Sequence, residues 1–181
     1  MIALEVRHLL ALDRMLLVVA NDPWQKAGTD VTPATTRLEL VADAVDHVNR
    51  QAGADRLEAS GIEIQRGGLT YTADTLDQIH ADNPGAELFL LVGSDAAAGL
   101  DSWSRPDDIR RLATTVVVDR GGREGGRPPD GWDHVVVEVP LMEISSSDLR
   151  ERIAVDAPVE ALLPPTVIDG IRRLELYRQD T

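Results

Sequence analysis

Short apolar runs alternate with helical patterns along most of this chain, and this alternation constrains its fold more than any other feature. Runs that are apolar throughout, rather than at every second residue, are typical of strands buried on both faces of a parallel sheet. The expected strands are Met15–Ala20, Ile62–Arg66, Glu87–Val92, Thr114–Asp119 and His134–Val139.

Helical patterns fill the intervals between these runs. In the longest of them, Leu38, Val41 and Val45 recur at helical spacing and predict a packing face. The expected helices are Ile2–Ala11, Thr35–Gln51, Ala73–Ala81, Pro106–Leu112 and Ser145–Ala154, with a last one after Pro164-Pro165. Strands that alternate with helices predict right-handed βαβ units, and therefore an α/β fold with a doubly wound parallel sheet.

Length and composition indicate one domain, residues 1–181, with a sizeable core. Gly121–Gly131 holds five glycines and two prolines, which predicts a surface loop between the last two strands. The chain has no cysteine, which fits a reducing cytoplasm, and no apolar run near the ~20 residues that span a membrane. A formal net charge of -13 argues against a nucleic-acid partner.

The segment Ile144–Arg150, Ile-Ser-Ser-Ser-Asp-Leu-Arg, places three hydroxyls and an arginine in the expected first turn of a helix. Helix N-termini offer unpaired backbone N–H groups, and arginine adds a charged fork that suits phosphate oxygens. The pattern therefore predicts a phosphate site. The alternative is a capping box in which Ser145 and Asp148 only start the helix.

Ligands of such folds bind beyond the carboxyl ends of the strands, so the residues that follow each run are candidates. Gly93-Ser94-Asp95 follows the third run. Gly93 lets the backbone turn sharply. One interpretation is that Ser94 or Asp95 caps the next helix. The other is that Asp95 accepts hydrogen bonds from ribose hydroxyls. Trp103 is either a packing residue or a flat surface for a heterocycle.

Three other segments follow strands or precede helices. Asn21–Lys26 ends in the only lysine of the chain, which is either a phosphate ligand or a solvated turn residue. Arg120 leads into a pair of glycines at the expected sheet edge, where arginine is usually solvated. Gly67–Thr72 precedes a helix, and its glycines and hydroxyls form either a binding loop or a turn with an N-cap.

In their order, these segments resemble the bacterial nicotinate-nucleotide adenylyltransferases over essentially the whole chain. The resemblance is carried by Gly-Gly-Leu-Thr-Tyr-Thr-Ala-Asp-Thr-Leu at 67–76, Val-Gly-Ser-Asp at 92–95, Trp103 and Ile144–Arg150. Pro23–Lys26 is similar to the Pro-Pro-His-Lys segment of that family in its actinobacterial form. Thr36–Leu38 is similar to its His-Arg-Leu helix start, and the tail from Pro164 to Tyr177 also fits.

The resemblance implies a Rossmann-like nucleotidyltransferase that joins ATP and nicotinate mononucleotide into deamido-NAD and pyrophosphate, with Mg²⁺ accompanying ATP. On the ATP side, the resemblance implies that the phosphates are bound by Ser146, Ser147, Arg150 and Lys26, and that a ribose lies at Gly93, Ser94 and Asp95. On the nicotinate side, it implies that Tyr71 and Thr72 offer backbone groups to the carboxylate. It also implies that Trp103 stacks on the pyridine ring. Arg37 either assists or is a structural ion-pair partner of a carboxylate, and Arg120 is a further possible ligand. No metal site built from protein side chains is expected, and the oligomeric state stays open.

One departure from the family pattern stands out. The family opens with a strand and then Gly-Gly-x-Phe-Asp-Pro-x-His-x-Gly-His, whereas Met1–Arg7 resembles the helix after the second histidine. No catalytic residue is therefore identified, and His8 is expected to be a helix-surface histidine. We expect an N-terminally shortened sequence and a poor catalyst. The first strand is central in the doubly wound order, between Met15–Ala20 and Glu87–Val92. If it is absent, we expect these two strands to be separated by a gap about two strand widths across. The alternative is that the sheet has closed and the two strands pair directly.

Two other functions remain open. The chain could be a non-catalytic remnant that binds a nucleotide without turnover. It could also be a related adenylyl- or cytidylyltransferase that uses phosphopantetheine or a cytidine nucleotide. Trp103 and Tyr71-Thr72 favour the nicotinate enzyme, because they are its nicotinate-side features.

Overall fold

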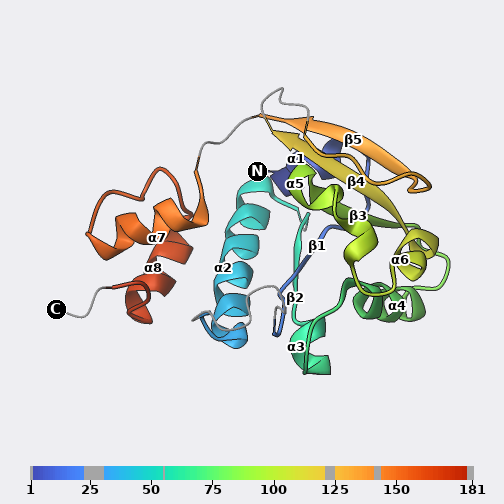
Figure 1. The fold of residues 1–181 in the computed structure, drawn as a ribbon. Helices are drawn as coiled ribbons and strands as arrows, with labels where there is room; N and C mark the ends of the chain where they lie inside the picture. The colour runs from blue at the N-terminus through green and yellow to red at the C-terminus, as the bar shows by residue number, and fades with distance from the viewer. Residues whose placement is uncertain (1, 23–30, 55, 121–124, 141–143, 179–181) are drawn as a thin grey trace.

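The computed structural model describes residues 2–22, 31–54, 56–120, 125–140 and 144–178. The described residues contain two groups of parallel strands (Figure 1). In one group β1 (Leu16–Val18) pairs with β2 (Glu58–Ser60). In the other, β4 (Ala113–Arg120) lies between β3 (Leu88–Gly93) and β5 (His134–Val139).

Helices connect these strands in the predicted alternation. They are α1 (Ile2–Leu9), α2 (Ala34–Ala52), α3 (Ile62–Arg66), α4 (Thr72–Asp82), α5 (Ser94–Ala97), α6 (Pro106–Leu112), α7 (Ser146–Ala154) and α8 (Pro165–Arg173), with a 3₁₀ turn η2 (Leu100–Ser102). All six expected helices are confirmed, and four of the five expected strands are found close to their predicted bounds. The α/β class with parallel strands is confirmed.

The fifth expected strand, Ile62–Arg66, is wrong because this segment is helix α3. The strand of this region is β2, which pairs with β1 from Glu58 to Ser60 and ends just before Gly61. Beyond Gly61 the side chain of Glu63 is buried and hydrogen-bonded to Thr75 of α4, a contact made from one helical turn. A short segment with two isoleucines does not distinguish a strand from a partly buried helical turn, and here the tertiary contact decided between them.

The strands β3 and β4 are covered by helices on both faces, whereas Val135 and Val136 of β5 are exposed. Phe89 and Leu91 of β3 pack into a cluster with α1 and α2, whereas Leu88 and Leu90 pack against α4 and α6. Neighbouring residues of a strand point to opposite faces, so one continuous apolar run supplies both cores. Helices on both faces are the arrangement of a doubly wound sheet.

An apolar cluster centred on Val6 of α1 joins the two groups of strands. Val6 is fully buried, and it packs with Met15 before β1, with Val45 of α2 and with Val116 and Val118 of β4. Since α1 thus contacts elements of both groups, its apolar face links them by packing.

The strands β1 and β3 do not pair with each other, although both belong to described parts of the chain. Both line one cavity of about 1010 Å³, together with residues of α1 and α4. The described strands therefore form two separate parallel groups, β1–β2 and β3–β4–β5, with this cavity between β1 and β3. The alternative of direct β1–β3 pairing is therefore wrong.

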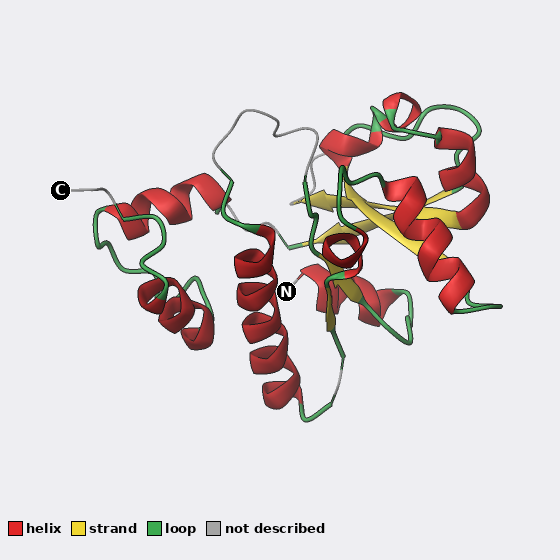
Figure 2. Cartoon of the chain, turned by 90° about the horizontal axis from the view of Figure 1, so that it is seen from below, coloured by secondary structure: helices red, strands yellow, loops and turns green. Residues whose placement is uncertain are grey.

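The last two helices lie together on the far side of α2 from the strands, in both ribbon views (Figure 1, Figure 2). The Thr166 hydroxyl donates to the carbonyl of Asp43 on α2 at 3.0 Å, and Arg173 pairs with Glu39 at 2.6 Å. These contacts attach α8 to the first half of α2. None of the described helices has the length and the apolar sequence that a bilayer crossing requires.

The predicted loop between the last two strands is found from residue 125 to 133, while residues 121–124 lie outside the described part of the chain. His8 is exposed at the end of α1, as expected of a helix-surface histidine.

We predict that Val6→Ala lowers the free energy of unfolding by about 1–3 kcal/mol, because it removes two methyl groups from a fully buried site that joins both groups of strands. Urea denaturation measures the change. Leu9→Ala is the control on the same helix, since Leu9 is 52% exposed and its truncation should cost less than about 0.5 kcal/mol. Equal losses for the two variants would contradict the role assigned to Val6.

Candidate active site

Two residues predicted to face the pyridine nucleotide lie in the wall of the same cavity. Thr72 is the first residue of α4, and Trp103 directly follows the turn η2. Both are half-buried, and both line the cavity between β1 and β3. Trp103 also packs against the apolar clusters that contain Leu100 and Val92, as the packing interpretation of this residue expected.

The loop that leads into α4 is fastened to the end of β1. Gly67 and Gly68 both have a φ of +71°, a conformation that side chains disfavour, so these glycines are required by the backbone. The Thr70 hydroxyl accepts hydrogen bonds from the backbone N–H groups of Asn21 at 3.1 Å and Asp22 at 3.2 Å. The Asn21 side-chain amide donates to the carbonyl of Gly68 at 2.9 Å.

Asn21 and Thr70 were not predicted as site residues. Their contacts join segments that are far apart along the chain, and a local pattern carries no signal for such contacts. The predicted helical cap is also modified, because Tyr71 is the N-cap residue of α4 and makes no side-chain capping hydrogen bond.

Arg37 has a structural role within the described part of the chain. Its Nε donates to the carbonyl of Thr32 at 2.9 Å, and its Nη2 donates to the carbonyl of Asn21 at 3.1 Å. Both acceptors are backbone carbonyl groups. Among the described residues, the contacts of Arg37 are therefore not the expected ion pair with a carboxylate. Arg37 instead holds together the two chain segments that precede α2 and follow β1.

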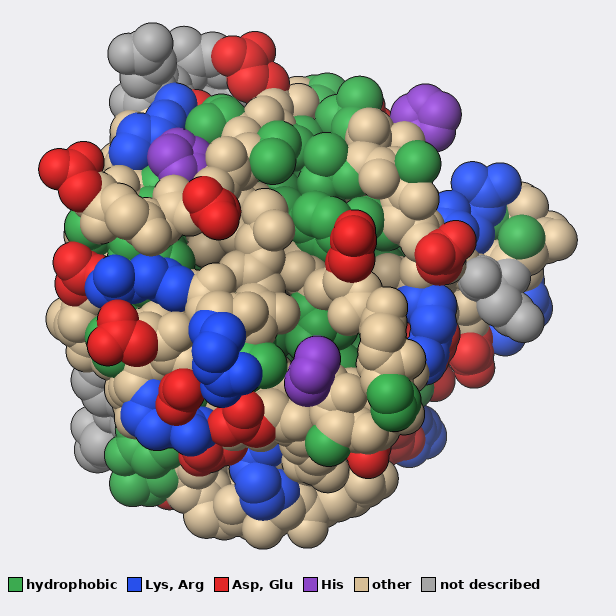
Figure 3. Space-filling view, turned by 90° about the vertical axis from the view of Figure 1, so that its right-hand side faces the viewer, with side chains coloured by type: hydrophobic (Ala, Val, Ile, Leu, Met, Phe, Trp, Pro, Cys, Tyr) green, Lys and Arg blue, Asp and Glu red, His purple; other side chains and the backbone are tan. Residues whose placement is uncertain are grey.

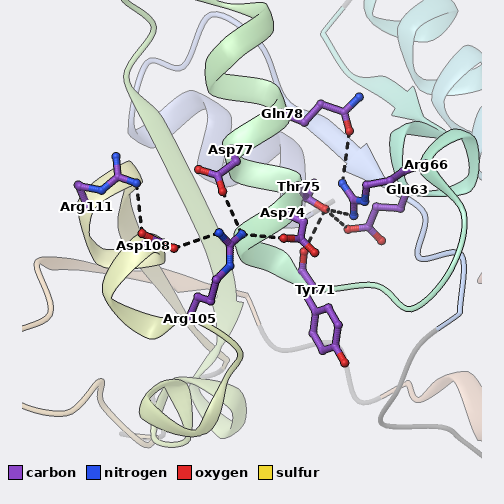
Figure 4. Close-up of polar contacts among 10 residues, drawn as sticks. All are labelled: Glu63, Arg66, Tyr71, Asp74, Thr75, Asp77, Gln78, Arg105, Asp108 and Arg111. Atoms are coloured by element: carbon purple, nitrogen blue, oxygen red, sulfur yellow. Dashed lines mark hydrogen bonds and ion pairs between the residues drawn. The ribbon is translucent and has the colours of Figure 1, made fainter.

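A second missed group fixes α3 to α4 (Figure 4). The buried Glu63 accepts a hydrogen bond from the Thr75 hydroxyl at 2.5 Å, and Thr75 in turn accepts one from Nη2 of Arg66 at 2.9 Å. Arg66 also donates to Gln78 at 3.3 Å. A buried carboxylate needs such partners, and here they hold the first turns of α4 in place behind Thr72.

Gly93 ends β3, and Ser94 and Asp95 begin α5. The expectation that Ser94 or Asp95 caps this helix is wrong, because Gly93 is the N-cap residue and the cap has no side-chain hydrogen bond. A sharp turn at Gly93 is also not found, since its φ is -69°. A methyl group at this position would meet no atom of the described part of the chain within 4 Å, so neither the backbone conformation nor packing against those residues demands glycine there.

The start of α7 contains the capping box that was the alternative to a phosphate site. The Ser145 hydroxyl accepts from the N–H of Asp148 at 3.0 Å, and the Asp148 carboxylate accepts from the N–H of Ser145 at 3.0 Å. These hydrogen bonds lower the pKa of Asp148 below its ordinary value. Ser146 and Ser147 take no part in the box and are exposed.

Arg150 is also exposed, and its Nη2 donates to the Ser147 hydroxyl at 3.2 Å. In both ribbon views α2 lies between α7 and the strands (Figure 1, Figure 2). Among the described residues, the structure does not bring Ser146, Ser147 or Arg150 into hydrogen-bonding contact with Gly93, Ser94 or Asp95.

Two predicted residues cannot be placed. Pro23–Lys26, and with it Lys26, lies outside the described residues, and so does the side chain of Arg120, whose backbone ends β4. Within the described part of the chain, His, Asp and Glu side chains form no group of three or more that could hold a metal ion.

Known proteins resemble this chain in sequence and in fold. The family described as cytidylyltransferase-like matches residues 1–152. A probable nicotinate-nucleotide adenylyltransferase of Corynebacterium kroppenstedtii is 39% identical over 178 residues, which covers 97% of this chain and 82% of that protein. One of Kineococcus radiotolerans, of the same name, is 38% identical over 178 residues and is covered to the same extent, 97% and 82%.

The fold is similar to that of the Plasmodium falciparum nicotinic acid mononucleotide adenylyltransferase solved in complex with NaAD, with a TM-score of 0.74. At 16% identity, over 97% of this chain and 88% of that one, this likeness concerns the fold alone. The sequence identity to the bacterial proteins is higher and extends over nearly the whole chain. The chain therefore belongs to the nicotinate-nucleotide adenylyltransferases, within the cytidylyltransferase-like family.

Proposed function

We propose that this protein transfers the adenylyl group of ATP to nicotinate mononucleotide, giving deamido-NAD and pyrophosphate. The observation that carries the proposal is the position of Thr72 and Trp103 in one cavity wall, in a chain whose relatives bear the name of this enzyme. A helix start with free N–H groups suits a carboxylate, and a flat indole beside it suits a pyridine ring. The absence of cysteine and the use of ATP favour a cytoplasmic enzyme.

The reaction needs no covalent intermediate on the protein. A phosphate oxygen of nicotinate mononucleotide attacks the α-phosphorus of ATP, the bond from that phosphorus to the bridging oxygen breaks, and the electron pair leaves with pyrophosphate. Catalysis then consists of holding the two phosphates in line and stabilising the growing charge. Mg²⁺ would arrive with ATP, because this ion prefers phosphate oxygens and water to a cage of protein ligands.

The site residues divide into two groups in this proposal. Tyr71, Thr72 and Trp103 would bind the nicotinate end, where the backbone of the α4 start meets the carboxylate. The ATP side would be formed by Gly93, Ser94 and Asp95 at the end of β3, with phosphate contacts from Ser146, Ser147, Arg150 and Lys26. Arg120 is a further candidate on this side. The exposed hydroxyls and guanidinium at the α7 start support a phosphate role, since the capping box leaves them available.

We predict pyrophosphate release only when ATP and nicotinate mononucleotide are present together. Replacing the acid by its amide should lower the rate at least about tenfold, because hydrogen bonds to a carboxylate are stronger than those to a neutral amide. A coupled pyrophosphate assay measures both. Equal rates for acid and amide would contradict the carboxylate site, and activity with phosphopantetheine or a cytidine nucleotide would favour the related transferases.

We predict that Gly93→Ala weakens ATP binding at least about tenfold while leaving the free energy of unfolding unchanged within about 0.5 kcal/mol. The reason is that a methyl group at residue 93 meets no atom of the described residues within 4 Å, so the clash expected is with a ligand that approaches the backbone. Titration calorimetry with ATP and urea denaturation give the two values.

Gly99→Ala is the matched control for this variant. A methyl group at residue 99 would meet its nearest protein atom at 3.7 Å, an ordinary contact, and Gly99 follows α5 rather than β3. If Gly93→Ala and Gly99→Ala bound ATP equally well, the nucleotide would not lie against Gly93.

We further propose that the active enzyme carries one more parallel strand between β1 and β3, the central strand of the family, followed by its histidine loop. The open edges of β1 and β3 support this proposal, because the strand would fill the part of the cavity between these edges. The part lined by Thr72 and Trp103 would stay open for the substrate. Unpaired strand edges facing one another are unfavourable, because each buried unpaired backbone group costs about 1–3 kcal/mol. In this proposal the histidine loop supplies further phosphate-binding groups, and a form without it should be a poor catalyst.

A form of the protein extended by the in-frame codons upstream of Met1 tests the added strand. We expect pyrophosphate release at least about 100-fold faster in the extended form, since the histidine loop adds transition-state stabilisation. An in-frame stop codon directly upstream, with no glycine- and histidine-coding stretch, would contradict the proposal. Inactivity of both forms, with ATP binding retained, would favour the non-catalytic nucleotide-binding protein.

A further inference from the structure

Arg105 is the centre of a cluster of carboxylates on the surface formed by α4 and α6 (Figure 4). Its Nη2 lies 2.6 Å from Asp74 and 2.9 Å from Asp77, both on α4. Its Nη1 lies 3.1 Å from Asp108 on α6. One guanidinium thus connects two helices through three ion pairs, and Figure 3 shows acidic and basic side chains interspersed over this side of the molecule.

The backbone of Arg105 indicates that this cluster is specified rather than incidental. Arg105 is the N-cap residue of α6, and its φ of +52° lies in the left-handed region that side chains disfavour. The hydrogen bond to Asp77, followed by the charges of the three carboxylates, raises the pKa of Arg105 further above its ordinary value. A conformation that is intrinsically unfavourable persists only when its surroundings hold it, and the three ion pairs are the contacts of Arg105 available for this.

The cluster lies next to both residues proposed for the nicotinate end. Arg105 is two residues after Trp103, and Asp74 is two residues after Thr72. Trp103 and Thr72 line the same cavity wall, so an ion pair between Arg105 and Asp74 ties together the two segments that carry them. In Figure 4 the Tyr71 ring points away from Arg105 and its carboxylates.

We propose that Arg105 is a positioning residue for the nicotinate nucleotide, because its pairing with Asp74, Asp77 and Asp108 holds Trp103 at a fixed place relative to the start of α4. This inference rests on the proposed function. Arg105 itself touches no ligand, and acts through the place it gives to the indole ring. To bind a pyridine ring and its carboxylate together, Trp103 and Thr72 must keep a fixed distance from each other. A mobile Trp103 would therefore lower the affinity for nicotinate mononucleotide and not that for ATP.

The test variant is Arg105→Gly, because glycine accepts a positive φ without strain while the ion pairs are lost. Glycine also adds backbone freedom, so Asp77→Asn, which leaves residue 105 unchanged, separates the loss of ion pairs from that effect. We expect the dissociation constant for nicotinate mononucleotide to rise about fivefold to tenfold, since three half-exposed ion pairs are each modest. The dissociation constant for ATP should change less than about twofold, because the β3 end is untouched. Titration calorimetry on the full chain measures both.

Hydrogen exchange without ligand supplies an independent readout. Amides of residues 100–105 and 72–77 should exchange faster in Arg105→Gly than in the wild type, while those of β4 and β5 should not change. Asp77→Asn, which removes one of the three carboxylates, should show a smaller effect in the same direction. Arg111→Ala is the matched control, since Arg111 makes a single ion pair to Asp108 at 3.3 Å from the same helix and should show neither change.

The outcomes separate this inference from the proposed function. Wild-type protein that fails to bind nicotinate mononucleotide would count against the function, whatever Arg105→Gly does to exchange. Unchanged exchange in both segments would overturn the inference, and so would faster exchange with unchanged affinity. An equal loss of affinity for both nucleotides would also overturn it, because it would show a general loss of structure instead of an effect on Trp103.

Discussion

The packing of α1 is the interaction on which the rest of this structure depends. Among the described strands no backbone pairing joins β1 to β3, so the two strand groups are held by side chains, with Val6 of α1 buried among residues of both. Hydrophobic packing is not directional and tolerates the cavity between the groups, whereas strand hydrogen bonds would not. The same separation places the ends of β1 and β3 on either side of one hollow, where the candidate site lies.

Polar contacts then fix the conformation of the loops around this cavity. Thr70 and Asn21 tie the loop before α4 to the end of β1, Glu63 and Thr75 tie α3 to α4, and Arg105 ties α6 to α4. All three sets of contacts act on the segment that begins at Thr72. A site that binds by orientation needs such supports, because its ligands are held by backbone groups and a ring face and not by a covalent bond.

The expected α/β order was confirmed, because helical spacing in segments such as Thr35–Gln51 and long apolar runs such as Glu87–Val92 are unambiguous patterns. The capping box at Ser145 and Asp148 was also readable, since it depends on residues three positions apart. The strand predicted at Ile62–Arg66 was wrong because a five-residue segment with two isoleucines fits a strand or one helical turn equally well. Thr70 and Arg105 were missed because their partners lie on other elements.

The sequence by itself therefore determined the family of this protein, the order of its helices and strands, and the groups available for phosphate, carboxylate and ring binding. These properties depend on residue types and short spacings, which the linear chain already contains. The tertiary structure alone decided that β1 and β3 face a shared cavity, that Thr72 and Trp103 lie in its wall, and that Arg105 connects the segments carrying them. Those properties depend on how distant segments approach one another, and that approach is set by packing over the whole domain.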